Sequence, residues 1–256
     1  MIKKAAVFVV SCAVLMTGCG GDASSETAEI QANLEQAGFP ADDIMVVDGA
    51  VYVGRDAHVT LEASHEMLQR GTESAEQYRT TNLVSSTVTK ICVNPTATFN
   101  TYAKLSVGLD MAIENYNQQN LSFQMARGPT TGCSANITAQ TDSSTGGSAG
   151  FPAGGLPYGT ITIGTGLQAY SVDVSEHVIT HELGHCVGFR HSDYYNRAIS
   201  CGGRKQNEGP STVGAILIPG TPSTSVVGMS VMNSCFRSTE NGEWTSSDIT
   251  ALQYLY

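Results

Sequence analysis

The sequence contains few charged residues, and basic residues are the scarcer kind. Of its 256 residues 14% are charged, and 13 Lys and Arg stand against 23 Asp and Glu, which gives a formal net charge of −10. A nucleic-acid partner is not expected, because a phosphate backbone binds to basic surfaces. Since 41% of the residues are apolar, the chain can bury one sizeable core, or one main domain and a small additional unit.

The N-terminal apolar run is too short to cross a bilayer as a stable helix. It covers residues 5–16 and follows two lysines, an arrangement typical of an export signal. Small residues directly before Cys19 resemble a bacterial lipoprotein signal. We therefore expect that residues 1–18 are removed and that Cys19 carries lipid. The exported protein would then be a bacterial lipoprotein anchored to a membrane or at the cell surface, or be released outside the cell. Ordinary secretion with Cys19 as a bystander is the alternative.

Cysteines are also few once this signal is set aside. Five remain, and export to an oxidising compartment favours disulfides between them. Because five is odd, at least one thiol stays free or pairs elsewhere, and spacing alone does not decide the pairing. We expect Cys186 to be a buried thiol or to pair with Cys201 or Cys235. The five are Cys92, Cys133, Cys186, Cys201 and Cys235.

Composition divides the rest of the chain into three parts. Residues 19–29 are small and polar and are expected to form a tether. Residues 30–80 are rich in acids and short elements, including a hairpin about Asp48 and Gly49, and we interpret them as a pro-segment or a small N-terminal domain. Residues 81–256 have longer elements and no internal repeats, and they are expected to form the main domain.

Hydrophobic periodicity places the individual elements. Helices are expected at residues 30–37, 63–70, 103–119 and 174–187, and a last helix follows residues 246–248. Strands are expected at residues 88–93, 121–125, 135–140 and 160–163, and residues 192–228 mostly as loop. The glycine-rich residues 148–155 are either an exposed loop or a sheet edge to which a peptide could add as a strand.

One segment has the spacing of a metal site. It reads His-Glu-Leu-Gly-His-Cys-Val-Gly-Phe-Arg-His from His181 to His191. On a helix, His181 and His185 lie on one face, so both imidazoles can bind one ion. Gly188 allows a left-handed turn that brings His191 back to the same ion. The sequence therefore predicts three histidine ligands for one zinc ion, with the fourth tetrahedral position open to water.

Glu182 follows the first of these histidines, close enough to hold a zinc-bound water without being a ligand. Zinc lowers the pKa of such a water toward neutrality, and Glu182 can take its proton as the water attacks a carbonyl. A purely structural zinc site would have four protein ligands and no need of this carboxylate. We therefore predict a catalytic site for peptide-bond hydrolysis. His177, one turn earlier on the helix, is expected to pack or to face solvent.

The segment matches the extended metzincin signature. Metzincins also have a Met-turn, a tight turn that places an apolar methionine beneath the metal, and Met232 lies at the matching place after His191. Astacin-like and serralysin-like members place a zinc-binding tyrosine two residues later, where this sequence has Ser234. We expect that ligand to be absent here, so that oxyanion stabilisation comes mainly from zinc and nearby donors.

The sequence is similar to the bacterial dual-action HEIGH metallopeptidases. The resemblance is carried by residues 181–194, by Gln-Tyr-Arg-Thr-Thr-Asn-Leu-Val at residues 77–84 and by Ser-Asp-Ile-Thr-Ala-Leu at residues 247–252, with Leu183 in place of the isoleucine of the family name. It covers roughly residues 77–256. It implies an α/β (α+β) metzincin-like zinc protease fold, with a twisted mixed sheet, an active-site helix and a small C-terminal subdomain. It also implies that the partner is a protein or peptide substrate.

Two acids outside this segment are further candidates. Asp193 can anchor the turn after His191, contact that ligand, or be an exposed turn acid. Asp56, in Val-Gly-Arg-Asp, resembles the aspartate that blocks zinc in astacin-like pro-segments. Residues 30–80 would then keep the enzyme latent. The alternative is a small domain that only supports the fold.

Two other functions are alternatives to a zinc endopeptidase. One is a non-catalytic surface-binding lipoprotein on a protease fold. Glu182 argues against it, because an inert relative has no need of a proton acceptor beside the ligands. The other is a zinc amidase that acts on cell-wall peptides by the same chemistry, which substrate assays would separate.

Replacement of the candidate lipidation site tests the expected localisation. Cys19→Ser should move the protein from the membrane fraction to the soluble fraction, because no sulfur remains to carry lipid. Fractionation of the producing cells measures this. Mass spectrometry that finds an unmodified Cys19 in the mature wild-type protein would reject lipidation.

Overall fold

The structure, a computed structural model, describes residues 23–68, 77–209, 215–222 and 224–256. The export signal, Cys19 and much of the linker expected before residue 81 lie outside these ranges. Within them, no helix is long and apolar enough to cross a membrane.

A mixed sheet of eight strands forms the centre of the fold, in the order β1-β2-β3-β8-β9-β7-β5-β6. Strands β6, β5, β7 and β9 are parallel, β8 is antiparallel to β9, and β3 is parallel to β8. The strands are β1 (Met45–Val47), β2 (Ala50–Val53), β3 (Ala57–Val59), β5 (Lys90–Pro95), β6 (Gln124–Arg127), β7 (Ala135–Asp142), β8 (Gly147–Gly150) and β9 (Thr160–Gly164). A separate ladder pairs β4 (Tyr78–Arg79) with β10 (Ile216–Leu217).

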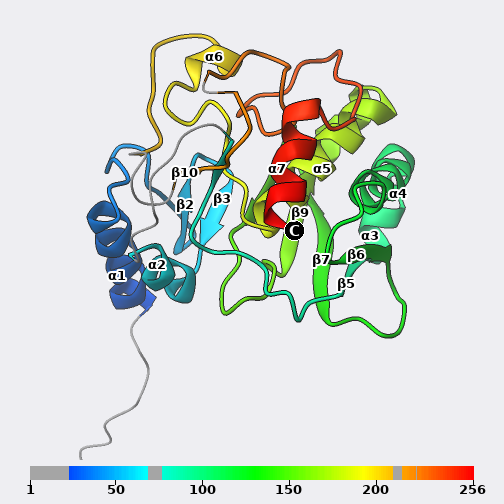
Figure 1. Ribbon diagram of the computed structural model, residues 1–256, viewed down its shortest axis with the longest axis horizontal. Helices are drawn as coiled ribbons and strands as arrows, with labels where there is room; N and C mark the ends of the chain where they lie inside the picture. Colours follow the sequence, from blue (N-terminus) through cyan, green and yellow to red (C-terminus); the bar gives the residue numbers. More distant parts are fainter. Residues whose placement is uncertain (1–22, 69–76, 210–214, 223) are drawn as a thin grey trace, which may run out of the picture.

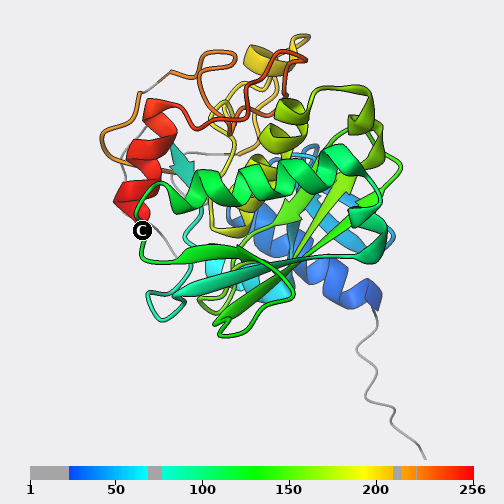
Figure 2. The ribbon, with the colours of Figure 1, turned by 90° about the vertical axis from the view of Figure 1, so that its right-hand side faces the viewer.

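The helices gather in two groups around this sheet. Helices α4 and α5 lie side by side on the sheet, and α1 and α2 pack together beside β2 (Figures 1 and 2). Helix α7 is the last element of the chain. The helices are α1 (Ala23–Gln36), α2 (Leu61–Met67), α3 (Ala97–Asn100), α4 (Ala103–Asn117), α5 (Val172–Cys186), α6 (Ala198–Cys201) and α7 (Ser246–Leu255), with a 3-10 turn at Thr165–Ala169. The predicted α/β fold with a mixed sheet and an active-site helix is confirmed.

Helix α5 carries the metal motif and is buried along most of its length. Its N-cap is Ser171, whose side chain accepts a hydrogen bond from the backbone N–H of Val174. Helix α4 packs closely against it because α4 has a glycine at the contact. A Cβ on Gly108 would lie 2.9 Å from the backbone nitrogen of Glu176. This contact holds the helix that carries the motif against the core.

The hairpin expected in the N-terminal part is present. Strands β1 and β2 pair with Val47 opposite Ala50. The two residues between them, Asp48 and Gly49, have φ of 51° and 85°. A two-residue turn with positive φ at both positions matches the twist of the strands that it joins. Because β3 continues this hairpin into β8, the boundary expected at residue 80 is not a break in the sheet.

The buried apolar residues nevertheless separate the N-terminal part from the rest. The larger cluster begins at Val84 and lies between the sheet and helices α4 and α5. A second cluster is formed by residues between Ile30 and Met67, with Phe151 as its fully buried member from outside that range. Residues 30–67 therefore share a sheet with the main domain but have an apolar core that is largely their own.

Two expectations about element ends need correction. Helix α1 begins at Ala23, inside the segment expected to be a tether, because Ala and Glu favour helix and Ile30 and Leu34 anchor its buried side. The strand expected at residues 121–125 begins only at Gln124. The described part of residues 192–228 is mostly loop, as expected, and contains the short elements α6 and β10.

Two disulfides are present among the described residues. They join Cys92 to Cys133 and Cys201 to Cys235. Cys186 is a free and buried thiol, the first of the expected alternatives. The second disulfide links the short helix α6 to the segment that follows Met232.

Candidate active site

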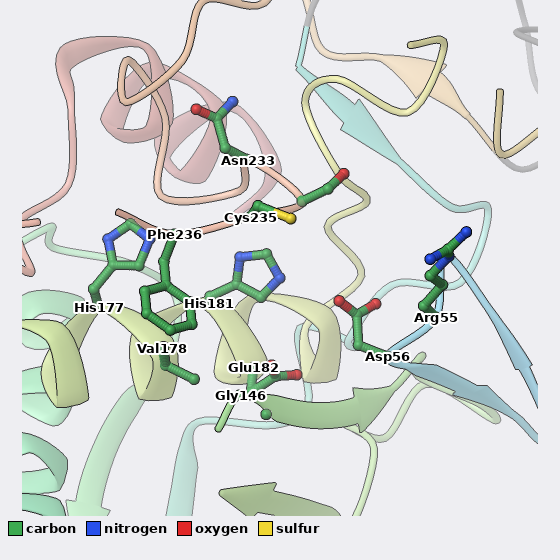
Figure 3. A pocket seen from close by; sticks show the side chains of 12 residues that line it. Arg55, Asp56, Gly146, His177, Val178, His181, Glu182, Asn233, Cys235 and Phe236 are labelled. Atoms are coloured by element: carbon green, nitrogen blue, oxygen red, sulfur yellow. The ribbon is translucent and has the colours of Figure 1, made fainter. Parts of the chain in front are cut away.

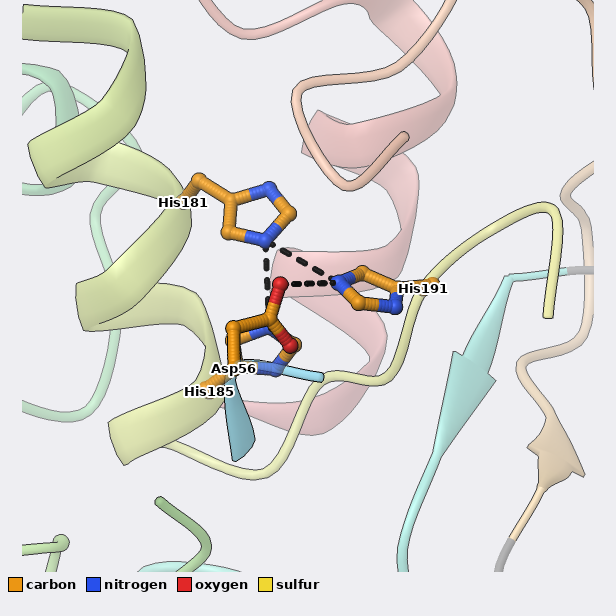
Figure 4. Close-up of side chains that lie close together, drawn as sticks. All are labelled: Asp56, His181, His185 and His191. Carbon is orange, nitrogen blue, oxygen red and sulfur yellow. Dashed lines mark hydrogen bonds and ion pairs between the residues drawn. The ribbon is translucent and has the colours of Figure 1, made fainter. Parts of the chain in front are cut away.

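The three histidines of the motif converge on one point. His181 and His185 come from consecutive turns of α5, and His191 follows the end of that helix. The Nε2 atoms of His185 and His191 lie 3.1 and 3.2 Å from Nε2 of His181 (Figure 4). All three side chains are buried.

The other ring nitrogen of each histidine is bound by a hydrogen-bond acceptor. Nδ1 of His181 lies 2.8 Å from the carbonyl oxygen of Val231, and Nδ1 of His185 lies 2.8 Å from that of Phe189. Nδ1 of His191 lies 2.9 and 3.1 Å from the two carboxylate oxygens of Glu208. These acceptors favour the tautomer with a proton on Nδ1, in which each Nε2 can present a lone pair to a metal ion at the shared point.

Three lone pairs at this separation repel one another unless a cation lies between them. Tetrahedral zinc with bonds of about 2.0–2.1 Å would place its nitrogen ligands about 3.3 Å apart, close to the observed spacing. Burial lowers the pKa of His185 to about 4 and that of His181 well below its ordinary value, so both rings are neutral, as a metal ligand must be. Burial alone would also lower the pKa of His191, but the carboxylates of Asp56 and Glu208 raise it well above its ordinary value, so a metal ion must displace a proton from this ring. The residues present fit a metal ion.

Gly188 makes this convergence possible. Its φ is 104°, and a Cβ there would lie 2.5 Å from the carbonyl oxygen of Asn82. Any side chain would meet both the strained backbone conformation and the neighbouring chain. After this turn, the backbone N–H of Arg190 donates to the carbonyl of Tyr78, which fixes the path to His191. The predicted role of Gly188 agrees with this geometry.

A carboxylate lies opposite the three nitrogens. Oδ2 of Asp56 is 3.2 Å from Nε2 of His191, and Oδ1 is 3.8 Å from Nε2 of His185 (Figure 4). One ligand atom from each of Asp56, His181, His185 and His191 can be chosen so that all lie within 4.8 Å of one another. Burial alone would raise the pKa of Asp56, but the nearby imidazoles lower it, so the group is an anion.

Glu182 points into the adjoining cavity and is buried. A Cβ on Gly147 would lie 2.4 Å from its Oε1, so the glycine in β8 allows the strand to approach this carboxylate. Its Oε2 has no hydrogen-bond partner among the described residues. Burial, with the negative charge of Asp56, raises the pKa of Glu182 well above its ordinary value. The group can therefore take up a proton readily.

Met232 packs against the face of helix α5 that carries His181 and His185. It is fully buried, and a Cβ on Gly184 would lie 2.6 Å from its sulfur. Asp248, which caps α7 together with Thr245, also accepts hydrogen bonds from the side chain of Ser230 and the backbone N–H of Val231. The C-terminal helix thus supports the turn whose Val231 carbonyl orients the first histidine.

Asp193 does not contact the third ligand. Its carboxylate is buried and accepts hydrogen bonds from the backbone and side chains of Ser200 and Ser234. It therefore anchors the turn after His191, and the expectation of an exposed acid is wrong. The partner of His191 is Glu208, which sequence reasoning missed. A single glutamate in a loop, with no partner nearby in sequence, gives no signal of this role.

A cavity of about 280 Å³ opens beside His181 and Glu182 (Figure 3). Val178 and Phe236 supply apolar walls, and Asp56 lies at its rim near the metal site. His177 lines the cavity rather than joining the ligand cluster, and burial lowers its pKa to about 4. A side chain of a bound molecule could occupy this space next to the ligand cluster.

Three convergent imidazoles, a carboxylate opposite them and a glutamate at an adjoining cavity define the site of a metal-dependent hydrolase. The chain belongs to the dual-action HEIGH metallo-peptidase family, whose model matches residues 51–256. The match begins earlier than residue 77, where the sequence resemblance was expected to start, and so includes Asp56. The protein is therefore a metallopeptidase.

Two solved structures are among those to which the chain is similar. High choriolytic enzyme 1, a hatching enzyme zinc-protease from Oryzias latipes (medaka fish), is 14% identical with a TM-score of 0.38, and the match covers 68% of this chain and 92% of that one. Myroilysin is 12% identical with a TM-score of 0.38, covering 66% and 92%. No protein of curated function matches the chain.

Removal of one imidazole tests the ligand set. His191→Ala should weaken zinc binding by more than the roughly 10–100-fold that loss of a supporting hydrogen bond costs, because a ligand itself is lost. Metal analysis after dialysis against a chelator measures this, with His177→Ala in helix α5 as the control. One tightly held zinc ion in His191→Ala would point to another ligand.

Proposed function

We propose that the protein is a zinc endopeptidase in which Glu182 acts as the proton acceptor. The observation that carries the proposal is the convergence of three Nε2 lone pairs beside the unpartnered Oε2 of Glu182, at the mouth of a cavity. A zinc ion held by the three histidines would supply a Lewis acid that polarises the carbonyl and lowers the pKa of water. Three imidazoles with one further position suit such an ion.

Glu182 supports this reaction by moving one proton. Its carboxylate accepts a proton from the water whose oxygen bonds to the peptide carbonyl carbon. The burial that raises its pKa lets it keep that proton until the carbon–nitrogen bond breaks. The proton then passes to the leaving amine nitrogen, which returns Glu182 to its anionic form. A non-catalytic surface protein would have no use for a buried carboxylate in this place, and a cell-wall amidase would use the same residues.

The role of Glu182 can be tested with a matched pair of variants. Glu182→Gln should keep fold and zinc but lose about 10²–10⁴-fold in turnover, because no proton acceptor remains. The control is Glu176→Gln, which changes a buried glutamate of the same helix outside the cavity. Both are incubated with a denatured-protein mixture, with and without a chelator and after limited trypsin treatment, and new termini are sequenced. Equal proteolysis by Glu182→Gln would refute the mechanism, and cleavage of cell-wall peptides alone would favour the amidase.

We further propose that residues 23–68 keep the enzyme latent. Asp56 lies where a fourth metal ligand would lie, so its carboxylate competes with water and substrate. Strand β3 also pairs with β8, with the backbone N–H of Ala149 donating to the carbonyl of Asp56. The edge that a peptide substrate could use for strand addition is thus occupied by the chain itself. The separate apolar core of this part supports its release as a unit.

Latency predicts that cutting the linker between this part and the main domain activates the enzyme. Limited trypsin treatment of the full chain should raise peptidase activity at least about 10-fold, because the fourth ligand position and the β8 edge become free. Asp56→Ala should raise the activity of the uncut chain toward a short peptide substrate. A wild-type chain that is fully active while intact by mass spectrometry would show that Asp56 is no latency device.

Membrane attachment through lipid on Cys19 is proposed on the sequence alone, because this residue lies outside the described ranges. Helix α1 starts four positions after Cys19. The proposed partners are a bilayer on one side and an exported protein or peptide substrate on the other.

A further inference from the structure

The carboxylate of Glu208 is the meeting point of several buried polar groups. Its side chain is 2% exposed. Besides Nδ1 of His191, it accepts from Nη1 of Arg197 at 2.7 Å and from Oγ of Ser234 at 3.3 Å, and it lies 3.6 Å from Nη2 of Arg190. The carboxylate of Glu208 is therefore surrounded by one imidazole, one hydroxyl and two guanidinium groups.

Arg197 connects this carboxylate to the proposed latency segment. The same Nη1 that donates to Glu208 also donates to the carbonyl oxygen of Gly54, two residues before Asp56. The backbone N–H of Gly54 donates to a carboxylate oxygen of Asp43 at 3.0 Å. The backbone N–H of Gly54 is therefore held by Asp43 from the N-terminal part, and its carbonyl oxygen is held by Arg197 from the main domain.

Gly54 also packs directly against the third metal ligand. Its φ is +62°, and a Cβ there would lie 3.1 Å from Oε2 of Glu208 and 3.2 Å from Nδ1 of His191. A glycine at this position lets the turn before Asp56 rest on the pair formed by the ligand and its carboxylate. The position of Asp56 over the site is thus set by contacts to groups that also orient His191.

We propose that Glu208 positions His191 for metal binding and that Arg197 uses this same carboxylate to hold the Asp56 turn in place. The inference rests on the metal site and the latency proposed above. An acceptor on Nδ1 fixes the tautomer and strengthens Nε2 as a ligand, which is how a carboxylate behind a metal-bound histidine acts. Arg197 also keeps Glu208 paired when the Asp56 turn leaves, so His191 stays oriented in the released enzyme.

The two roles make separable predictions for the full chain. Glu208→Gln should weaken zinc binding about 10–100-fold, because a neutral amide is a poorer acceptor for the imidazole N–H. Arg197→Met should leave zinc affinity closer to that of the wild type but speed amide hydrogen exchange in the peptide that contains Gly54 and Asp56. Zinc affinity is measured by competition with a chelator, and exchange by mass spectrometry on the same zinc-loaded samples.

The control is Glu240→Gln, which removes the charge of another buried glutamate that is paired with Arg237 and lies away from the ligands. It should change zinc affinity less than about twofold. If Glu208→Gln does not fold, Glu208→Asp takes its place. This variant keeps the charge but has a shorter side chain, so its carboxylate lies farther from the imidazole of His191 and zinc binding should still weaken. A Glu208 variant that binds zinc as tightly as the control, or unchanged exchange at Gly54 in Arg197→Met, would overturn the proposal. Neither measurement uses a substrate, so an inactive wild-type enzyme would contradict the peptidase function without affecting this inference.

Discussion

The structure depends on bringing the Nε2 atoms of three imidazoles together around one buried point. Such an arrangement is repulsive in a buried site, so it requires a cation and a frame rigid enough to hold the rings. The frame is built from three separate places. The carbonyls of Val231 and Phe189 and the carboxylate of Glu208 each hold one Nδ1. Each ring is therefore held in one orientation, with its Nε2 directed toward the shared point.

Close backbone approach is the second constraint, and glycine meets it repeatedly around the site. Gly188 turns the chain back toward the metal against the carbonyl of Asn82, and Gly184 leaves room for the sulfur of Met232. Gly147 brings β8 next to Glu182. At each place a Cβ would lie closer than van der Waals contact allows, so the helix, the edge strand and the supporting turn could not pack together around the ligands.

The N-terminal part is joined to the catalytic part in an unusual way for a segment proposed to leave. It extends the same sheet through β3 and β8, yet its apolar residues pack mainly on one another. Backbone pairing and the polar contacts of Asp56 and Gly54 place it over the cleft, while most of its hydrophobic stabilisation stays within itself. A unit held this way can cover the metal site without being part of the core that supports the site.

Some features of this protein were readable from the sequence because they are local. The spacing of His181, His185 and His191 about Gly188 specifies the ligand set, since helix periodicity and one left-handed turn act over eleven residues. The hairpin at Asp48 and Gly49 and the amphipathic helix α4 are local in the same sense. A pattern of this kind depends on residues that are close together in the sequence, so it can be recognised without knowing how the rest of the chain folds.

Other features were decided only when distant segments met. The pairing of the cysteines, the choice of Glu208 rather than Asp193 as the partner of His191, and the place of Asp56 against the ligands each join residues far apart in sequence. The role of a buried carboxylate depends on the charges that folding places around it, and the residues next to it in the sequence do not indicate which charges these are. The sequence alone therefore determined which residues are the candidate metal ligands, and the tertiary structure decided what orients them and what covers them.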